Sequence, residues 1–280
     1  MSDQARDQET RPRRLGGAVY ILPNLITTGN LFFGFFSIIK SLNGQFGWAA
    51  GAIFLAAIFD VLDGRVARLT KGTSEFGVQY DSLCDCVSFG VAPAFLMYQY
   101  GLVNLGRIGW VACFVFMACG TLRLARFNVL SAIGKASGDF TGLPIPMAAI
   151  AVASFVSFMV DLDQRRAAEG LFNWPIIEHL LNPDFRQMFL AFLSPILAVL
   201  MVSNILYKSH KVLKFRSVKP FQLLVLFVML ISLLAYAPEM VGFCLIFIYV
   251  LTGPMAWAIG WTKLTNEDEI FAESTIEDEP

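Results

Sequence analysis

Apolar runs of about 20 residues recur along the whole of this 280-residue chain. A run of that length crosses the hydrocarbon core of a bilayer, roughly 30 Å thick, when it forms an α-helix. Hydrophobic residues make up 56% of the chain and charged residues only 15%, which is too little polar surface for a soluble domain of this length. The sequence therefore predicts an all-α polytopic membrane protein.

Eight segments are predicted to span the membrane, and we place them at residues 20–42, 46–69, 80–100, 106–128, 144–162, 188–206, 220–236 and 239–261. Pro238 separates the last two, because proline interrupts a helix. The expected organisation is a cytoplasmic segment at 1–19, a transmembrane domain at 20–262 and an acidic, disordered tail at 263–280.

Lysines and arginines are distributed unequally between the two sides of the membrane. With eight spans both termini share one side, and that side collects Arg6, Arg11, Arg13, Arg14, Arg65, Arg68, Lys71, Arg123, Arg126, Lys135, Lys208, Lys211, Lys214, Arg216, Lys219 and Lys263. The other side keeps Arg107, Arg165, Arg166 and Arg186. Positive charge favours the cytoplasmic face, so we expect both termini in the cytoplasm. The basic loop 207–219 either attracts anionic lipid head groups or only sets this topology.

Four aspartates, Asp60, Asp63, Asp81 and Asp85, lie beside or inside apolar runs. The members of the first pair are three residues apart and those of the second four apart, so each pair shares one face of a helix. An antiparallel hairpin of the two spans would bring these faces together at their cytoplasmic ends. Converging carboxylates repel one another and are costly in a membrane, and Mg²⁺, Mn²⁺ or Ca²⁺ would suit their hard oxygens.

Small residues and an arginine surround these aspartates. Gly64 and Ala67 leave the backbone accessible to a ligand, and Gly77 supplies a similar gap before the second pair. Arg68 can meet a phosphate with its planar guanidinium. Together these features indicate a diphosphate site that faces the cytoplasm. The alternative interpretation is that each aspartate caps a helix or pairs with Arg65 or Arg68.

Eight residues of this chain resemble, in type and spacing, the signature of the CDP-alcohol phosphatidyltransferase family. They are Asp60, Asp63, Gly64, Ala67, Arg68, Gly77, Asp81 and Asp85. The flanking segments LPNLITTGNLFFGF, YDSLCDCVSFGVAPA, LRLARFNV and FTGLPIPMAA are similar to the serine-using branch of that family. Cys84 and Cys86 stand where that branch is expected to have small apolar residues. The resemblance is strong over residues 20–150 and continues only as a pattern of spans.

The resemblance implies a metal-dependent transfer of a phosphatidyl group from CDP-diacylglycerol to L-serine, with release of CMP. Its implied cofactors are two divalent cations, Mg²⁺ or Mn²⁺, on the aspartates. Asp60, Asp63 and Asp81 are implied as ligands, and Asp85 as general base and further ligand. The implied partners are the two substrates and membrane lipid, with no nucleic acid.

Two further groups of residues are candidates for substrate contacts. Asn24, Thr27 and Thr28 lie near the cytoplasmic start of the first span and can hold CMP or phosphate, although Asn24 after Pro23 also suits a helix N-cap. Arg123 and Arg126 either bind a substrate anion, such as the carboxylate of serine, or act as topology signals.

Gly47 and Gly51 form a GxxxG pair in the second span. Such a pair allows two helices to approach closely, either inside one chain or across a homodimer.

Two other functions remain open at this point. A phosphatidyltransferase could use glycerol 3-phosphate, inositol or choline in place of serine. A divalent-cation transporter could also use intramembrane carboxylates, but it should carry them near mid-membrane with a pathway to the other face.

Overall fold

The computed structural model describes residues 16–70, 74–132, 140–169, 175–207 and 220–260. Its long helices are α1 (Gly16–Leu42), α2 (Phe46–Thr70), α5 (Arg107–Ala132), α6 (Ile145–Glu169), α8 (Pro183–Val202), α9 (Pro220–Tyr236) and α10 (Pro238–Ala258). The shorter elements are α3 (Glu75–Asp85), α4 (Ala92–Met97), α7 (Pro175–Leu181) and two strands, β1 (Phe140–Thr141) and β2 (Leu206–Tyr207). The predicted segment 1–19, the loop 207–219 and the tail 263–280 lie mostly or wholly outside the described residues.

Seven helical segments of the described chain are long and apolar enough to cross a membrane. This confirms the prediction of an all-α polytopic membrane protein. The seventh predicted span, 220–236, coincides with α9, which has 17 residues and is not among these seven segments. Its length is about 26 Å at about 1.5 Å per residue, short of a hydrocarbon core of roughly 30 Å. Pro238 opens α10 directly after α9 ends, as predicted.

The third span is assembled from several pieces of helix. It runs from Glu75 to Leu105, longer than the predicted 80–100. After α3 the chain passes through a π-helical turn η1 (Cys86–Val91), then α4, a second π-helical turn η2 (Tyr98–Leu102) and a 3₁₀ turn η3 (Val103–Leu105). Single π-helical turns inside a helix are frequent at functional sites, and η1 begins directly after Asp85.

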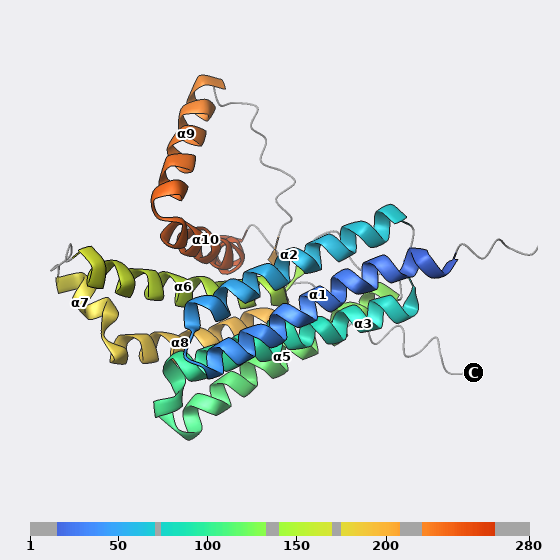
Figure 1. Cartoon of the computed structure of the whole chain (residues 1–280), viewed down its shortest axis with the longest axis horizontal. Helices are drawn as coiled ribbons and strands as arrows, with labels where there is room; N and C mark the ends of the chain where they lie inside the picture. The colour runs from blue at the N-terminus through green and yellow to red at the C-terminus, as the bar shows by residue number, and fades with distance from the viewer. Residues whose placement is uncertain (1–15, 71–73, 133–139, 170–174, 208–219, 261–280) are drawn as a thin grey trace, which may run out of the picture.

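The core of the bundle lies between α2 and α6, which pack against each other through small side chains. Buried alanines dominate both helices at this contact, namely Ala49, Ala50, Ala52 and Ala56 of α2 with Ala148, Ala149, Ala151 and Ala153 of α6. Small residues let membrane helices approach closely. On the other side of α2, helix α1 packs against both α2 and α3, while α5 packs against α8 (Figure 1). Helix α9 projects away from this bundle and meets α10 at one end (Figure 1).

The two glycines of the GxxxG pair have different surroundings. A Cβ on Gly47 would lie 3.4 Å from Val160 of α6, so this glycine serves close packing within the chain. A Cβ on Gly51 would meet no atom within 4 Å. The homodimer therefore stays a prediction.

Backbone hydrogen bonds attach the segment before α6 to the end of α8 and the residues that follow it. Strands β1 and β2 pair antiparallel, with Phe140 opposite Tyr207. The Gly142 amide donates to the carbonyl of Ile205 at 2.9 Å, and the Leu143 amide donates to the carbonyl of Leu200 at 2.9 Å. Gly142 has φ +72°, and an added Cβ would collide with the carbonyl oxygen of Met201. This turn therefore requires glycine.

We expect Gly142→Ala to destabilise the protein by about 1–3 kcal/mol, because alanine is strained at positive φ and would also clash. Thermal unfolding of the purified protein in detergent measures this as a lower unfolding temperature. Gly51→Ala is the matched control, since its methyl group meets open space inside a helix and should leave stability unchanged or slightly raised. An equal effect of the two substitutions would contradict the assignment of Gly142.

Candidate functional site

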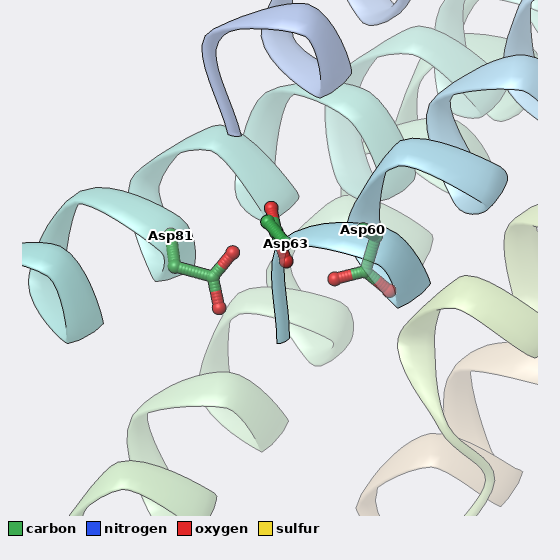
Figure 2. Close-up of side chains that lie close together, drawn as sticks. All are labelled: Asp60, Asp63 and Asp81. Carbon is green, nitrogen blue, oxygen red and sulfur yellow. The ribbon is translucent and has the colours of Figure 1, made fainter. Parts of the chain in front are cut away.

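Three of the four predicted aspartates come together at one end of the bundle. Asp60 and Asp63 lie on the last turns of α2, and Asp81 lies on α3. Each contributes a carboxylate oxygen to a group in which all such atoms lie within 4.8 Å of one another. Figure 2 shows Asp63 between the other two, with the carboxylates of Asp60 and Asp81 turned toward it. We call Asp60, Asp63 and Asp81 the carboxylate group.

The carboxylate group has the chemistry of a cation site. Asp63 Oδ2 and Asp81 Oδ1 are buried and have no hydrogen-bond partner within the described part of the chain. Among these same residues, no arginine or lysine forms an ion pair with the three carboxylates. Arg68 instead donates its Nε–H to the carbonyl oxygen of Gly64 at 2.9 Å. Three unneutralised carboxylates repel one another, so their oxygens fit a hard divalent cation such as Mg²⁺ or Mn²⁺.

Asp85 lies one turn beyond Asp81 and is not part of the carboxylate group. It is 7% exposed, and its Oδ1 accepts a hydrogen bond from Asn30 Nδ2 of α1 at 2.9 Å. The structure therefore separates the four aspartates into a cluster of three and one carboxylate with a neutral partner.

Helix α1 is fixed against η1 at the level of Asp85. Ser88 Oγ donates to the backbone carbonyl of Asn30 at 3.0 Å. A side chain on Gly34 would collide with Ser88, so glycine permits this close approach. These contacts hold Asn30 in place beside Asp85.

The candidate nucleotide residues line the same end of the bundle. A Cβ on Gly64 would meet no atom within 4 Å, so this stretch of α2 backbone is open. Gly77 lies where α3 approaches α1, because its Cβ would be 3.3 Å from Asn24 Oδ1. Thr28 Oγ1 lies 3.0 Å from the hydroxyl of Tyr80, within hydrogen-bonding distance. Ala67 is half-buried on the same helix as Gly64.

The structure also decides the alternative proposed for Asn24. Helix α1 begins at Gly16 and includes Pro23, so Asn24 lies inside a helix and the N-cap interpretation is wrong. Thr27 is buried; it donates to the Pro23 carbonyl at 3.1 Å and lies next to Asp63. Proline here removes an amide of the first part of α1 without ending the helix.

The two candidate arginines of α5 have different surroundings. Arg123 is 8% exposed, lies near Asp85 of α3 and Tyr249 of α10, and has no hydrogen-bond partner for its Nε among the described residues. Arg126 donates to Asn204 Oδ1 at 2.7 Å and lies 3.4 Å from the carbonyl oxygen of Val202. Arg126 therefore connects α5 to the end of α8, whereas Arg123 is buried.

Sequence reasoning missed Asn30 and Ser88. Asn30 follows Thr27 by three residues, and buried polar side chains continue along the same helix at Ser37 and Ser41. This polar face within an apolar span was the available signal, since polar residues inside membrane helices usually face the protein interior.

Residues 20–181, which include the candidate site, match the family model for CDP-alcohol phosphatidyltransferase. The chain belongs to this family of membrane-embedded transferases. The matching region contains α1, α2 and α3 and therefore the whole carboxylate group.

Similarity to individual relatives covers from about a third of this chain to nearly all of it. The CDP-diacylglycerol–serine O-phosphatidyltransferase of Helicobacter pylori is 36% identical over 246 residues, which cover 88% of this chain and 94% of the relative. The archaetidylserine synthase of Methanothermobacter thermautotrophicus is 45% identical over 136 residues, 48% of this chain and 57% of the relative. A CDP-diacylglycerol–serine O-phosphatidyltransferase of Methanocaldococcus jannaschii is 48% identical over 103 residues, 37% of this chain and 47% of the relative.

Proposed function

We propose that this chain transfers the phosphatidyl group of CDP-diacylglycerol to the hydroxyl of L-serine, giving phosphatidylserine and CMP in a metal-dependent reaction. The observation that carries the proposal is the carboxylate group, with Asp85 beside it, in a chain of this family. The Helicobacter pylori relative, which matches along 94% of its length, is a CDP-diacylglycerol–serine O-phosphatidyltransferase, and this supports serine as the acceptor.

The donor is proposed to bind at the mouth of the site with its acyl chains in the bilayer. Two divalent cations, Mg²⁺ or Mn²⁺, held by the carboxylate group would neutralise the diphosphate and the charge that develops on CMP. Open space at Gly64 and the small side chain of Ala67 are proposed to leave room for this diphosphate, and exposed Arg68 offers it a guanidinium. Asn24, Thr27, Thr28 and Gly77 are proposed to contact the CMP part.

Asp85 is proposed to act as the general base. It takes the proton from the serine hydroxyl while the oxygen–phosphorus bond forms, and the bond from phosphorus to CMP breaks. A neutral hydroxyl is a weak nucleophile, so a base of this kind is required. The hydrogen bond from Asn30 supports this role, because it leaves Asp85 with one oxygen uncommitted. A second role as metal ligand also belongs to the proposal and is tested below.

The active site is proposed to face the cytoplasm. Arg65 and Arg68 on α2 lie at the end of the bundle that holds the carboxylate group, and Arg123 and Arg126 of α5 lie toward that end as well. The distribution of positive charge supports this orientation. Both termini would lie on that same side if α9 also crosses the membrane and brings the number of spans to eight. A reporter fused to either terminus should be accessible only from the cytoplasm.

A divalent-cation transporter is less well supported. The carboxylate group is one cluster at one end of the bundle, and no second cluster of metal-ligating side chains occurs elsewhere in the described ranges. A transporter requires a pathway that continues toward the other face. Transport of Mn²⁺ into vesicles that contain the purified protein would favour this alternative.

We expect L-serine to be the preferred acceptor when purified protein is assayed with CDP-diacylglycerol, metal and a panel of alcohols. A site that binds a particular polar group discriminates strongly against acceptors that lack it. Transfer to glycerol 3-phosphate, inositol and choline should therefore be at least about 100-fold less efficient in kcat/KM. Faster transfer to glycerol 3-phosphate than to serine would reject the acceptor and leave the family assignment intact.

A further inference from the structure

Three polar side chains from three different helices meet at the buried end of the site. Asp85 of α3 is 7% exposed, Asn30 of α1 is fully buried and Arg123 of α5 is 8% exposed. Asn30 Nδ2 donates to Asp85 Oδ1 at 2.9 Å, and Arg123 lies close enough to Asp85 for an electrostatic attraction. The proposed base therefore accepts a hydrogen bond from a neutral amide of one helix, has the carboxylates of Asp60, Asp63 and Asp81 nearby, and shares this buried region with a guanidinium of another helix.

Two atoms of this group have unused hydrogen-bonding capacity. Asn30 Oδ1 and Arg123 Nε are buried and have no hydrogen-bond partner within the described ranges. The orientation of the Asn30 amide follows from its neighbour, because a carboxylate accepts hydrogen bonds and so faces the NH₂ group. The Asn30 carbonyl oxygen is then left to accept from some other donor. Buried polar atoms without partners are rare and call for an explanation.

An α-amino acid has the complementary groups. Its ammonium only donates hydrogen bonds and its carboxylate only accepts them. Asn30 Oδ1 can accept from the ammonium, and the Arg123 guanidinium can donate to the carboxylate. Asp85 is hydrogen-bonded to Asn30 and can receive the proton of the side-chain hydroxyl. Sequence reasoning supplied a cation for serine but no acceptor for its ammonium, and Asn30 supplies that acceptor.

This arrangement disfavours the other alcohols for separate reasons. Glycerol 3-phosphate and inositol offer Asn30 Oδ1 only a neutral hydroxyl, which is a weaker hydrogen-bond donor than an ammonium. Choline carries a quaternary ammonium without an N–H, so it cannot donate to Asn30 Oδ1. Ethanolamine has an ammonium but leaves Arg123 without a carboxylate. Among these acceptors, only serine offers an ammonium to Asn30 and a carboxylate to Arg123.

We propose that Asn30 and Arg123 determine acceptor specificity by binding the ammonium and the carboxylate of L-serine on either side of Asp85. This inference rests on the proposed function, because it names the residues that select the acceptor of that same site. It also gives Asn30 two contacts, one to the base and one to the substrate.

The test compares acceptors that lack one group at a time. Transfer from CDP-diacylglycerol in the presence of metal is measured with L-serine, with 3-hydroxypropanoate, which lacks the ammonium, and with ethanolamine, which lacks the carboxylate. Where transfer to an analogue is too slow to measure, its inhibition constant against serine replaces kcat/KM. The proteins are the full-length wild type, Asn30→Ala and Arg123→Gln.

Asn30→Ala should reduce the preference for serine over 3-hydroxypropanoate by at least about tenfold and leave the preference over ethanolamine within about threefold. Arg123→Gln should show the reverse pattern. A variant that only disturbs Asp85 would slow all three acceptors equally, so the ratios separate substrate binding from positioning. Ser194→Ala is the matched control, because Ser194 Oγ is also buried and unpartnered but lies on α8 away from the site.

Unchanged ratios in Asn30→Ala would overturn the assignment of Asn30, and a shift caused by Arg126→Gln rather than Arg123→Gln would overturn that of Arg123. If Asn30→Ala does not fold, Asn30→Ser keeps a smaller polar side chain and should show an intermediate loss of preference. The wild type alone provides a further test, because the proposal requires 3-hydroxypropanoate to bind much more weakly than serine. If the wild type prefers a different alcohol to serine, the proposed function itself fails. If serine is preferred but the ratios do not change, only the pocket is wrong.

Discussion

Chelation of divalent cations with EDTA should abolish transfer, and added Mg²⁺ or Mn²⁺ should restore it. The reason is the carboxylate group, in which three carboxylate oxygens lie within 4.8 Å of one another and two buried oxygens have no partner among the described residues. Asp60→Asn, Asp63→Asn and Asp81→Asn should each lower kcat by at least about 100-fold, as the loss of electrostatic stabilisation of a transition state does elsewhere. Assay of the purified variants under saturating metal and substrate measures this loss.

A readout that does not depend on activity strengthens this test. Without metal, like charges in the carboxylate group repel, so each Asp→Asn variant should unfold in detergent at the same or a higher temperature than the wild type. Added Mn²⁺ should then stabilise the wild type more than the variants, because binding to the folded state raises stability. Asp163→Asn is the matched control, because Asp163 is exposed and lies beside Gly44, at the end of α2 remote from Asp63. Full activity in excess chelator would reject the metal requirement.

Most of the fold could be predicted because membrane helices are specified by length and apolarity. The second predicted span, 46–69, differs from α2 by one residue at its end, since a short connection precedes it and basic residues follow it. The interior of the third span could not be predicted in the same way. Its π-helical turn η1 accompanies the close contact between Ser88 and Gly34, and these residues are far apart in sequence. Strands β1 and β2 also depend on a contact between distant segments.

Part of the candidate site could likewise be predicted from the sequence, and part could not. The convergence of Asp60, Asp63 and Asp81 follows from helical spacing and from the short connection between α2 and α3, both of which are visible in the sequence. The hydrogen bond that Asp85 accepts from Asn30 is not visible in the sequence, because it depends on how α1 packs against α3. Likewise, Arg123 and Arg126 are three residues apart on one helix, and only packing against α8 gives Arg126 its partner Asn204.

Asp85→Asn should lower kcat by about 10²–10⁴-fold, the range that general bases contribute, while its affinity for CDP-diacylglycerol falls less than that of Asp60→Asn. The structural reason is that Asp85 lies outside the carboxylate group and faces Asn30. Asparagine has nearly the same shape as aspartate, and its carbonyl oxygen can still accept from Asn30 Nδ2. The substitution therefore removes the basic oxygen and keeps the local hydrogen bond.

Single-turnover transfer and donor binding must be measured on the same preparations. Binding is followed by the protection that CDP-diacylglycerol gives against thermal unfolding in the presence of Mn²⁺, which depends on affinity and not on turnover. If Asp85 acts as the base, Asp85→Asn retains this protection and Asp60→Asn loses it. If both variants lose protection equally, Asp85 acts chiefly as a metal ligand and the serine proton must pass to another group. The geometry favours the first result, because Asp85 contributes no oxygen to the carboxylate group that would hold the metal, and its second oxygen can still take a proton.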